Sequence, residues 1–199
     1  MVLAFSFLAM PMVQEVQAAE NKEYQIKAAF LYNFIKFVDW PKKKNEDSNE
    51  PITIGIIGKD PFGDAFEPLK NKQVKDRQVV IKRFKALEEL EKAGEEGKTE
   101  LDKQIETIRK CYLLFICSSE EKNLGRIINS VKEHNVLTVG EMSGFVEAGG
   151  IVNFLVEEKK IRFEINAVAA TRAGLKIRSK LLRLAKRVIE AKSSEDTED

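Results

Sequence analysis

Residues 137–186 read LTVGEMSGFVEAGGIVNFLVEEKKIRFEINAVAATRAGLKIRSKLLRLAK. The apolar run 137–140 stops at a glycine, which is typical of a short buried strand. Apolar runs at 151–156 and 161–166 flank four polar residues, and this spacing predicts a β-hairpin. Apolar and polar residues alternate in 161–166, which indicates an antiparallel strand near a sheet edge, with one buried face.

The end of this stretch has a different period. Beyond Gly174, apolar residues fall on one helical stripe and basic residues point away from it. The stripe consists of Leu181, Leu184, Ala185, Val188 and Ile189. The sequence therefore predicts a basic amphipathic helix that covers the sheet at the C-terminal end.

The preceding part of the chain alternates between strand and helix patterns. Residues 20–40 carry apolar side chains at helical spacing, and Pro41 is expected to end this helix. Apolar or alternating runs predict strands at 52–58, 78–84, 111–117 and 136–140. Residues 85–110 predict two helical pieces with a break at 94–97. Ser118 and Glu121 match a capping box for a helix that ends near residue 134.

Together these elements predict an α/β fold. The strand, helix and strand between residues 111 and 140 form a βαβ unit, whose strands are parallel. We expect a three-layer α/β/α sandwich with a mixed, mostly parallel sheet and an antiparallel C-terminal hairpin.

Length and charge limit the domain count and the partners. The chain has 199 residues, which fits one domain. Its 33 basic and 32 acidic residues give a net charge of +1. This balance provides no bulk attraction to nucleic acid or to anionic membranes. The basic C-terminal helix is interpreted as the solvent-facing side of a packed helix, so no nucleic-acid partner is predicted.

The N-terminus has the pattern of a signal peptide. Residues 2–13 form an apolar run that is too short to span a bilayer, which requires about 20 residues. Small residues near Ala18 suit a cleavage site, although the run is not preceded by a basic residue. We predict a signal peptide at 1–18, export, a single domain at 19–192 and a disordered acidic tail at 193–199.

Cys111 and Cys117 are the only cysteines. In one strand, six residues separate their Cα atoms by about 20 Å. A disulfide requires less than about 7 Å. The two thiols therefore cannot pair with each other, and the pattern favours buried thiols that act as small hydrophobic side chains.

Polar residues follow three of the predicted strands. In open α/β sheets, ligands bind beyond the carboxyl ends of parallel strands. Asp60, Ser118, Ser119 and Glu141 would meet there and form a candidate ligand site. The alternative is structural: the first three are helix caps and Glu141 is a solvated loop acid.

Two aromatic residues are candidates for contact with a partner protein. Phe145 lies in a glycine-rich loop and is either displayed to solvent or inserted against the sheet. Tyr32 lies off the main stripe of the first helix, so we expect it to be exposed. Neither a serine-nucleophile motif nor a zinc-ligand spacing is present, so no catalysis, metal or cofactor is predicted.

Three blocks of the sequence resemble the YfiR-type family of bacterial periplasmic proteins. The blocks are KAAFLYNF at 27–34 with FVDWP at 37–41, IGIIG at 54–58 with DPFG at 60–63, and LTVGE, GF, GGIVNF, RFEIN, AGL and LLRLA within 137–185. The resemblance spans most of the chain in matching order.

The resemblance implies a periplasmic regulatory protein that represses or modulates a membrane-bound diguanylate cyclase or sensor kinase by protein contact. It also implies that an outer-membrane protein can sequester the regulator, and that a homodimer forms. An exposed edge strand at 161–166 would permit such a dimer. The alternative function is a soluble receptor for a small polar ligand in the crevice at the strand ends.

Overall fold

The computed structural model describes residues 11–41 and 50–191, with side chains from residue 21 onward. The predicted signal peptide lies partly outside these residues, and the predicted tail lies entirely outside them. Eight strands form one sheet in the order β10-β8-β7-β6-β5-β2-β4-β3. Two further strands, β1 (Val38–Asp39) and β9 (Lys176–Ile177), pair antiparallel with each other.

The centre of the large sheet is parallel. It contains β4 (Arg77–Phe84), β2 (Ile52–Ile57), β5 (Leu113–Ile116), β6 (Leu137–Gly140) and β7 (Val152–Glu157). Toward the ends of the sheet, β3 (Gln73–Val74) runs antiparallel to β4 and β8 (Lys160–Asn166) runs antiparallel to β7. The last strand, β10 (Arg187–Ile189), runs parallel to β8. The predicted mixed, mostly parallel sheet is confirmed.

The β7–β8 hairpin has the predicted position and a tight turn. Glu158 and Lys159 connect the strands, and both have positive φ angles, 48° and 61°. Two consecutive residues of this kind form a type I′ turn, whose twist matches that of a two-stranded ribbon.

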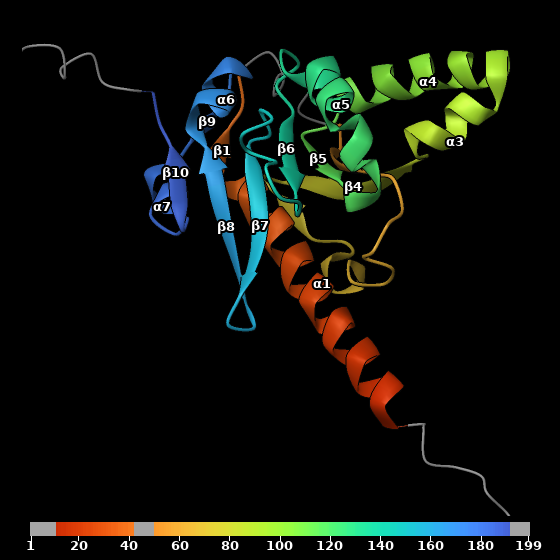
Figure 1. Ribbon diagram of the computed structural model, residues 1–199. Coiled ribbons are helices and arrows are strands. Elements are labelled where there is room, and N and C mark those ends of the chain that lie inside the picture. Colours follow the sequence, from red (N-terminus) through yellow and green to blue (C-terminus); the bar gives the residue numbers. More distant parts are fainter. Residues whose placement is uncertain (1–10, 42–49, 192–199) are drawn as a thin grey trace, which may run out of the picture.

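Helices cover both faces of the sheet (Figure 1). One face carries α1 (Pro11–Phe37), which is longer than predicted and ends at Phe37, because the chain then continues as strand β1. The N-terminal end of α1 projects beyond the sheet in Figure 1. The other face carries α3 (Leu87–Lys92), α4 (Gly94–Arg109) and α5 (Leu124–Val131). The three-layer sandwich is therefore confirmed.

Aromatic rings fix α1 to the hairpin. Phe30 and Phe34, one helical turn apart, both pack against Phe154 of β7 and Phe163 of β8, with ring centroids 5.2–5.9 Å apart. The apolar stripe that predicts the helix is thus the face that it buries.

Strand β5 is buried on both faces and separates two hydrophobic clusters. Leu113 and Phe115 belong to the cluster under α1, while Leu114 and Ile116 belong to the cluster under α4 and α5. The two cysteines that flank the strand divide in the same way: Cys117 lies in the first cluster and Cys111 in the second. Both thiols are buried, and they form no disulfide with each other.

The prediction of a long C-terminal helix is wrong. Only the four-residue α7 (Ser179–Leu182) forms, and the chain then becomes strand β10. Leu184, assigned to the buried stripe, is 60% exposed. The β-branched Val188 and Ile189 suit an edge strand, and they pair with Ile165 and Asn166 of β8. Between β8 and β9, residues Ala167–Arg172 form the helix α6, which was not predicted from the sequence.

Two further expectations are corrected by the structure, and the first of them concerns the edge of the hairpin. Glu164–Asn166 face β10, so this part of β8 is not the open edge expected to support a homodimer. The capping box at Ser118 does not form either. The segment Ser118–Asn123 is the 3₁₀ helix η2, which lacks a side-chain hydrogen bond at its cap.

Candidate functional site

The carboxyl ends of β2, β5 and β6 lie at one edge of the sheet, as predicted from their parallel register. Two of the four candidate residues there stabilise the loops. Asp60 accepts hydrogen bonds from the Phe62 amide (2.8 Å) and from Arg83 Nε (2.6 Å). Ser119 Oγ accepts one from the Lys59 amide (2.9 Å). Asp60 therefore shapes a turn, and Ser119 ties the loop after β5 to the loop after β2.

Ser118 and Glu141 line a pocket of about 510 Å³ beside α1. Its polar wall includes Glu23, Tyr24 and Lys27 of α1, and its other wall is the end of β7 from Asn153 to Val156. The structure thus brings two of the four predicted ligand residues to one pocket, where residues of α1 join them.

Lys27 is the central charge of this pocket. Its side chain is only 4% exposed, and Nζ lies 2.5 Å from both Glu141 Oε2 and Glu23 Oε1. The ammonium also lies 4.5 Å from the centre of the Tyr24 ring, and the Tyr24 hydroxyl donates to Glu141 Oε1 (3.0 Å). A buried charge requires such partners, because transfer from water without them is costly.

The sequence analysis missed Lys27, although a signal was present. Lys27 precedes Leu31 and Phe34 by four and seven residues, so it occupies a position on the buried stripe of α1. A lysine at an apolar position of an amphipathic helix indicates a buried ion pair. Its partner Glu141 is 114 residues away, which helical spacing does not reveal.

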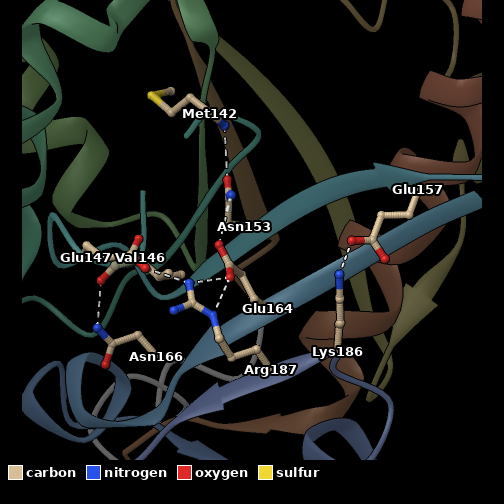
Figure 2. Close-up of polar contacts among 9 residues, drawn as sticks. All are labelled: Met142, Val146, Glu147, Asn153, Glu157, Glu164, Asn166, Lys186 and Arg187. Carbon is tan, nitrogen blue, oxygen red and sulfur yellow. Dashed lines mark hydrogen bonds and ion pairs between the residues drawn. The ribbon is translucent and has the colours of Figure 1, made fainter. Parts of the chain in front are cut away.

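A second polar cluster joins the glycine-rich loop to the hairpin (Figure 2). Asn153 Oδ1 accepts from the Met142 amide (3.1 Å), and its Nδ2 donates to Glu164 Oε1 (3.2 Å). The guanidinium of Arg187 bonds to Glu164 Oε2 (Nε, 2.8 Å) and to Glu147 Oε1 (2.6 Å). The hydrogen bond from Arg187 holds the pKa of Glu147 below its ordinary value.

The two residues proposed to contact a partner are not exposed. Phe145 is completely buried. Its ring lies so close to the backbone of Gly140 and Gly150 that a Cβ atom at these positions would be 2.4 and 2.1 Å from the ring. The two glycines therefore make space for the ring against the sheet. Tyr32 is 9% exposed, and its hydroxyl donates to the carbonyl of Gln73 (2.9 Å). The expectation of exposure is wrong for Tyr32, and of the two alternatives left open for Phe145 the structure shows insertion against the sheet.

The thiol of Cys117, at the end of β5, is in its unreactive form. Burial raises the pKa of Cys117 far above its ordinary value, so the thiol stays protonated at neutral pH. The thiolate is the reactive form of cysteine. In the described part of the chain, no group of three or more histidine, cysteine, aspartate or glutamate residues is arranged to hold a metal ion.

The chain is similar to solved structures and to one described protein family. Among the described helices, none has both the length and the apolar character needed to cross a membrane. No curated protein matches the chain significantly. It is similar to a solved conserved domain protein from Vibrio cholerae O1 biovar El Tor strain N16961, with 12% identity and a TM-score of 0.50 over 68% of this chain and 54% of that one.

A second structural likeness is to an ABC domain from Streptococcus pneumonia solved with L-Trp, with 13% identity and a TM-score of 0.49 over 69% of this chain and 55% of that one. The chain thus spans about half the length of both structures. At this identity the Vibrio likeness shows the fold alone. Residues 24–186 match the family described as YfiR/HmsC-like, from the packed part of α1 to the start of β10. The chain therefore belongs to the YfiR/HmsC-like family.

Proposed function

We propose that this protein is a periplasmic regulator that represses or modulates a membrane-bound diguanylate cyclase or sensor kinase by protein contact, without catalysing a reaction. The observation that carries the proposal is the family match over residues 24–186. The match includes the Lys27–Glu141 pair and every strand from β1 to β9, so it covers most of the sheet.

The chemistry of the strand ends supports binding rather than catalysis. The polar groups there bond to each other: Glu141 to Lys27, Asp60 to Arg83, and Ser119 to the Lys59 amide. A catalytic acid or base must instead have a proton-transfer partner in the substrate within hydrogen-bond reach. These contacts fix α1 and the loops on the sheet, which suits a rigid scaffold for contact.

Export is part of the proposal. Cleavage after Ala18 would fall inside α1 and leave its packed part, from Tyr24 onward, attached to the sheet. Intact-mass analysis of the protein purified from the periplasmic fraction should give a chain that begins at Ala19. A full-length chain confined to the cytoplasm would contradict export.

Regulation can be tested with cyclic di-GMP as the readout. We expect co-expression of the full chain with a membrane diguanylate cyclase of the same organism to lower cellular cyclic di-GMP. The same chain without residues 1–18 should have no effect, because it stays on the other side of the membrane from the cyclase's sensory part. Equal cyclic di-GMP levels in the two strains, for each such cyclase tested, would contradict repression by contact.

A receptor for a small polar ligand is the second candidate, and the pocket of about 510 Å³ at Lys27 and Glu141 favours it. Thermal-shift screening with nucleotides, amino acids and cell-envelope fragments tests it. A stabilising ligand whose effect disappears in Glu141→Ala and persists in Asp60→Ala would place binding in this pocket.

In either function, an outer-membrane protein would act by sequestering the regulator, and a homodimer would present two copies of the contact surface.

A further inference from the structure

Strand β4 leaves part of its outer edge uncovered. Successive residues of a strand direct their backbone groups to opposite sides. The Phe84 carbonyl accepts from the Gly58 amide at the end of β2, so Phe84, Lys82 and Val80 face β2. The residues between them, Val79, Ile81 and Arg83, face outward.

The outer neighbour β3 is short. It pairs only with Arg77 and Gln78, and the Val79 amide donates to the Lys72 carbonyl. Among the described residues, no strand lies beside the backbone groups of Ile81 and Arg83. Such a row of unpaired amides and carbonyls is a template for another strand.

A pocket lies against this edge. It has a volume of about 330 Å³, and its apolar lining includes Phe66, Leu69, Val79 and Ile81. Lys70 and Arg83 contribute to the same lining. An added strand would direct alternate side chains to this face of the sheet, so one of them would enter the pocket.

The segment around this edge is strongly basic. Residues 70–85 contain seven basic residues and one acidic residue, in a chain whose net charge is +1. Lys70 and Arg83 form ion pairs with Glu67 and Asp60. Within the described residues, Lys72, Lys75 and Lys82 form no ion pair with a carboxylate. Two copies of this edge would repel each other, which disfavours a second copy of the chain as its occupant.

We propose that the open edge of β4 binds an extended acidic segment of the regulated partner protein, which adds a strand to the sheet beside β4. Backbone hydrogen bonds to Ile81 and Arg83 hold the segment, and an apolar side chain of it fills the adjacent pocket. The carboxylates of the segment face Lys82 and the other unpaired lysines of residues 70–85. This inference rests on the proposed regulation by contact, and it names the surface and the chemistry of that contact.

The test uses the full chain and two labelled peptides. In the first, glutamate alternates with valine over a length equal to that of β4, 8 residues. In the second, lysine replaces each glutamate. We expect the acidic peptide alone to bind, as measured by fluorescence anisotropy, and to slow amide hydrogen exchange at Ile81 and Arg83. Exchange at Leu114, in the centre of the sheet, should not change.

A matched pair of variants isolates the backbone contact. Ile81→Ala keeps the outward amide, whereas Ile81→Pro removes it without removing a bond to β2. We expect the proline variant to bind the acidic peptide about tenfold more weakly than the alanine variant, because it loses one backbone hydrogen bond to the peptide. Lys82→Glu, which retains the backbone, should also weaken binding of the acidic peptide.

Several results would overturn the inference. These are equal binding of the two peptides, equal binding by the two Ile81 variants, or protection of Ile81 in the free protein that rises with its concentration, which would indicate a second copy at the edge. The exported chain could lower cyclic di-GMP while the Ile81→Pro and Lys82→Glu variants lower it to the same extent. In that case the assignment of the β4 edge as the contact surface is wrong, and the regulatory function stands. If only peptide binding is observed, the edge stands and the function is wrong.

Discussion

Both ends of the eight-stranded sheet carry basic side chains, but within the described residues these are paired with carboxylates near β10 and partly unpaired near β3 and β4. At one end, β10 is 3 residues long, and its Arg187 and the preceding Lys186 are paired with glutamates of the hairpin and the glycine-rich loop. At the other end, β4 is 8 residues long and Lys82 projects without a carboxylate partner among the described residues. Internal acids pair the charges at the first end, which we call the closed end, while the second, the open end, keeps its cation and the outward backbone groups of β4 available.

The largest expected effect concerns the loop that supports the closed end. Phe145→Ala removes a completely buried ring between two glycines, so it should destabilise the fold by about 3–5 kcal/mol. Urea unfolding followed by circular dichroism measures this change. Leu184→Ala, which truncates a side chain that is 60% exposed, is the control and should have little effect. Similar unfolding midpoints for the two variants would show that Phe145 does not anchor the loop.

The next effect distinguishes buried from exposed pairing at the closed end. Glu164→Ala leaves Asn153 Nδ2 and part of Arg187 without an acceptor, so we expect a loss of about 2–3 kcal/mol. Glu157→Ala breaks the exposed pair with Lys186 and should cost less than about 1 kcal/mol. Chemical denaturation of both variants provides the comparison. If Glu157→Ala is the more damaging, burial does not determine how strongly this edge is closed.

A smaller effect depends on pH. Arg187 lowers the pKa of Glu147, so the folded state binds the proton less readily than the unfolded state. The resulting stability is fully present above the ordinary glutamate pKa of 4.5 and is lost as the pH falls through the lower folded value. Glu147→Gln should therefore be slightly less stable than the parent at pH 7, and this difference should shrink as the pH falls below 4.5. A difference that stays the same from pH 7 to pH 3 would exclude this ionisation as the cause.

The smallest change in stability is expected at the open end. Lys82→Val should alter the free energy of unfolding by less than about 0.5 kcal/mol, because Lys82 is exposed. It should nevertheless promote association between copies, since a lysine on an edge strand opposes strand pairing. Analytical ultracentrifugation over a range of concentrations measures this. Lys159→Val, in the hairpin turn, is the control, and equal association of both variants would show that Lys82 does not protect the edge.

Much of the fold could be predicted from the sequence, because the signals are local. The buried strands appear as apolar runs, and the hairpin as two runs around a polar turn. The segment after Gly174 was mispredicted because helical spacing of Leu181 and Val188 is also compatible with a turn followed by a strand. Pairing of Val188 with Ile165 of β8 determines the outcome, and that contact is distant in sequence.

The candidate site was only partly predictable for the same reason. Parallel register placed Ser118 and Glu141 at one edge of the sheet. The partner of Glu141, Lys27, comes from α1, and the direction in which α1 crosses the sheet depends on packing of Phe30 and Phe34 against the hairpin. Phe145 was ambiguous because a ring flanked by glycines can be displayed or enclosed, and only the distances to Gly140 and Gly150 decide.

The two buried thiols that flank β5 give the molecule a pair of built-in reporters. Cys117 is buried beneath α1, whereas Cys111 is buried beneath the helices of the opposite layer. A thiol reagent can reach each one only when its own layer detaches from the sheet. Alkylation rates of single-cysteine variants would therefore show whether the two layers detach together or one after the other.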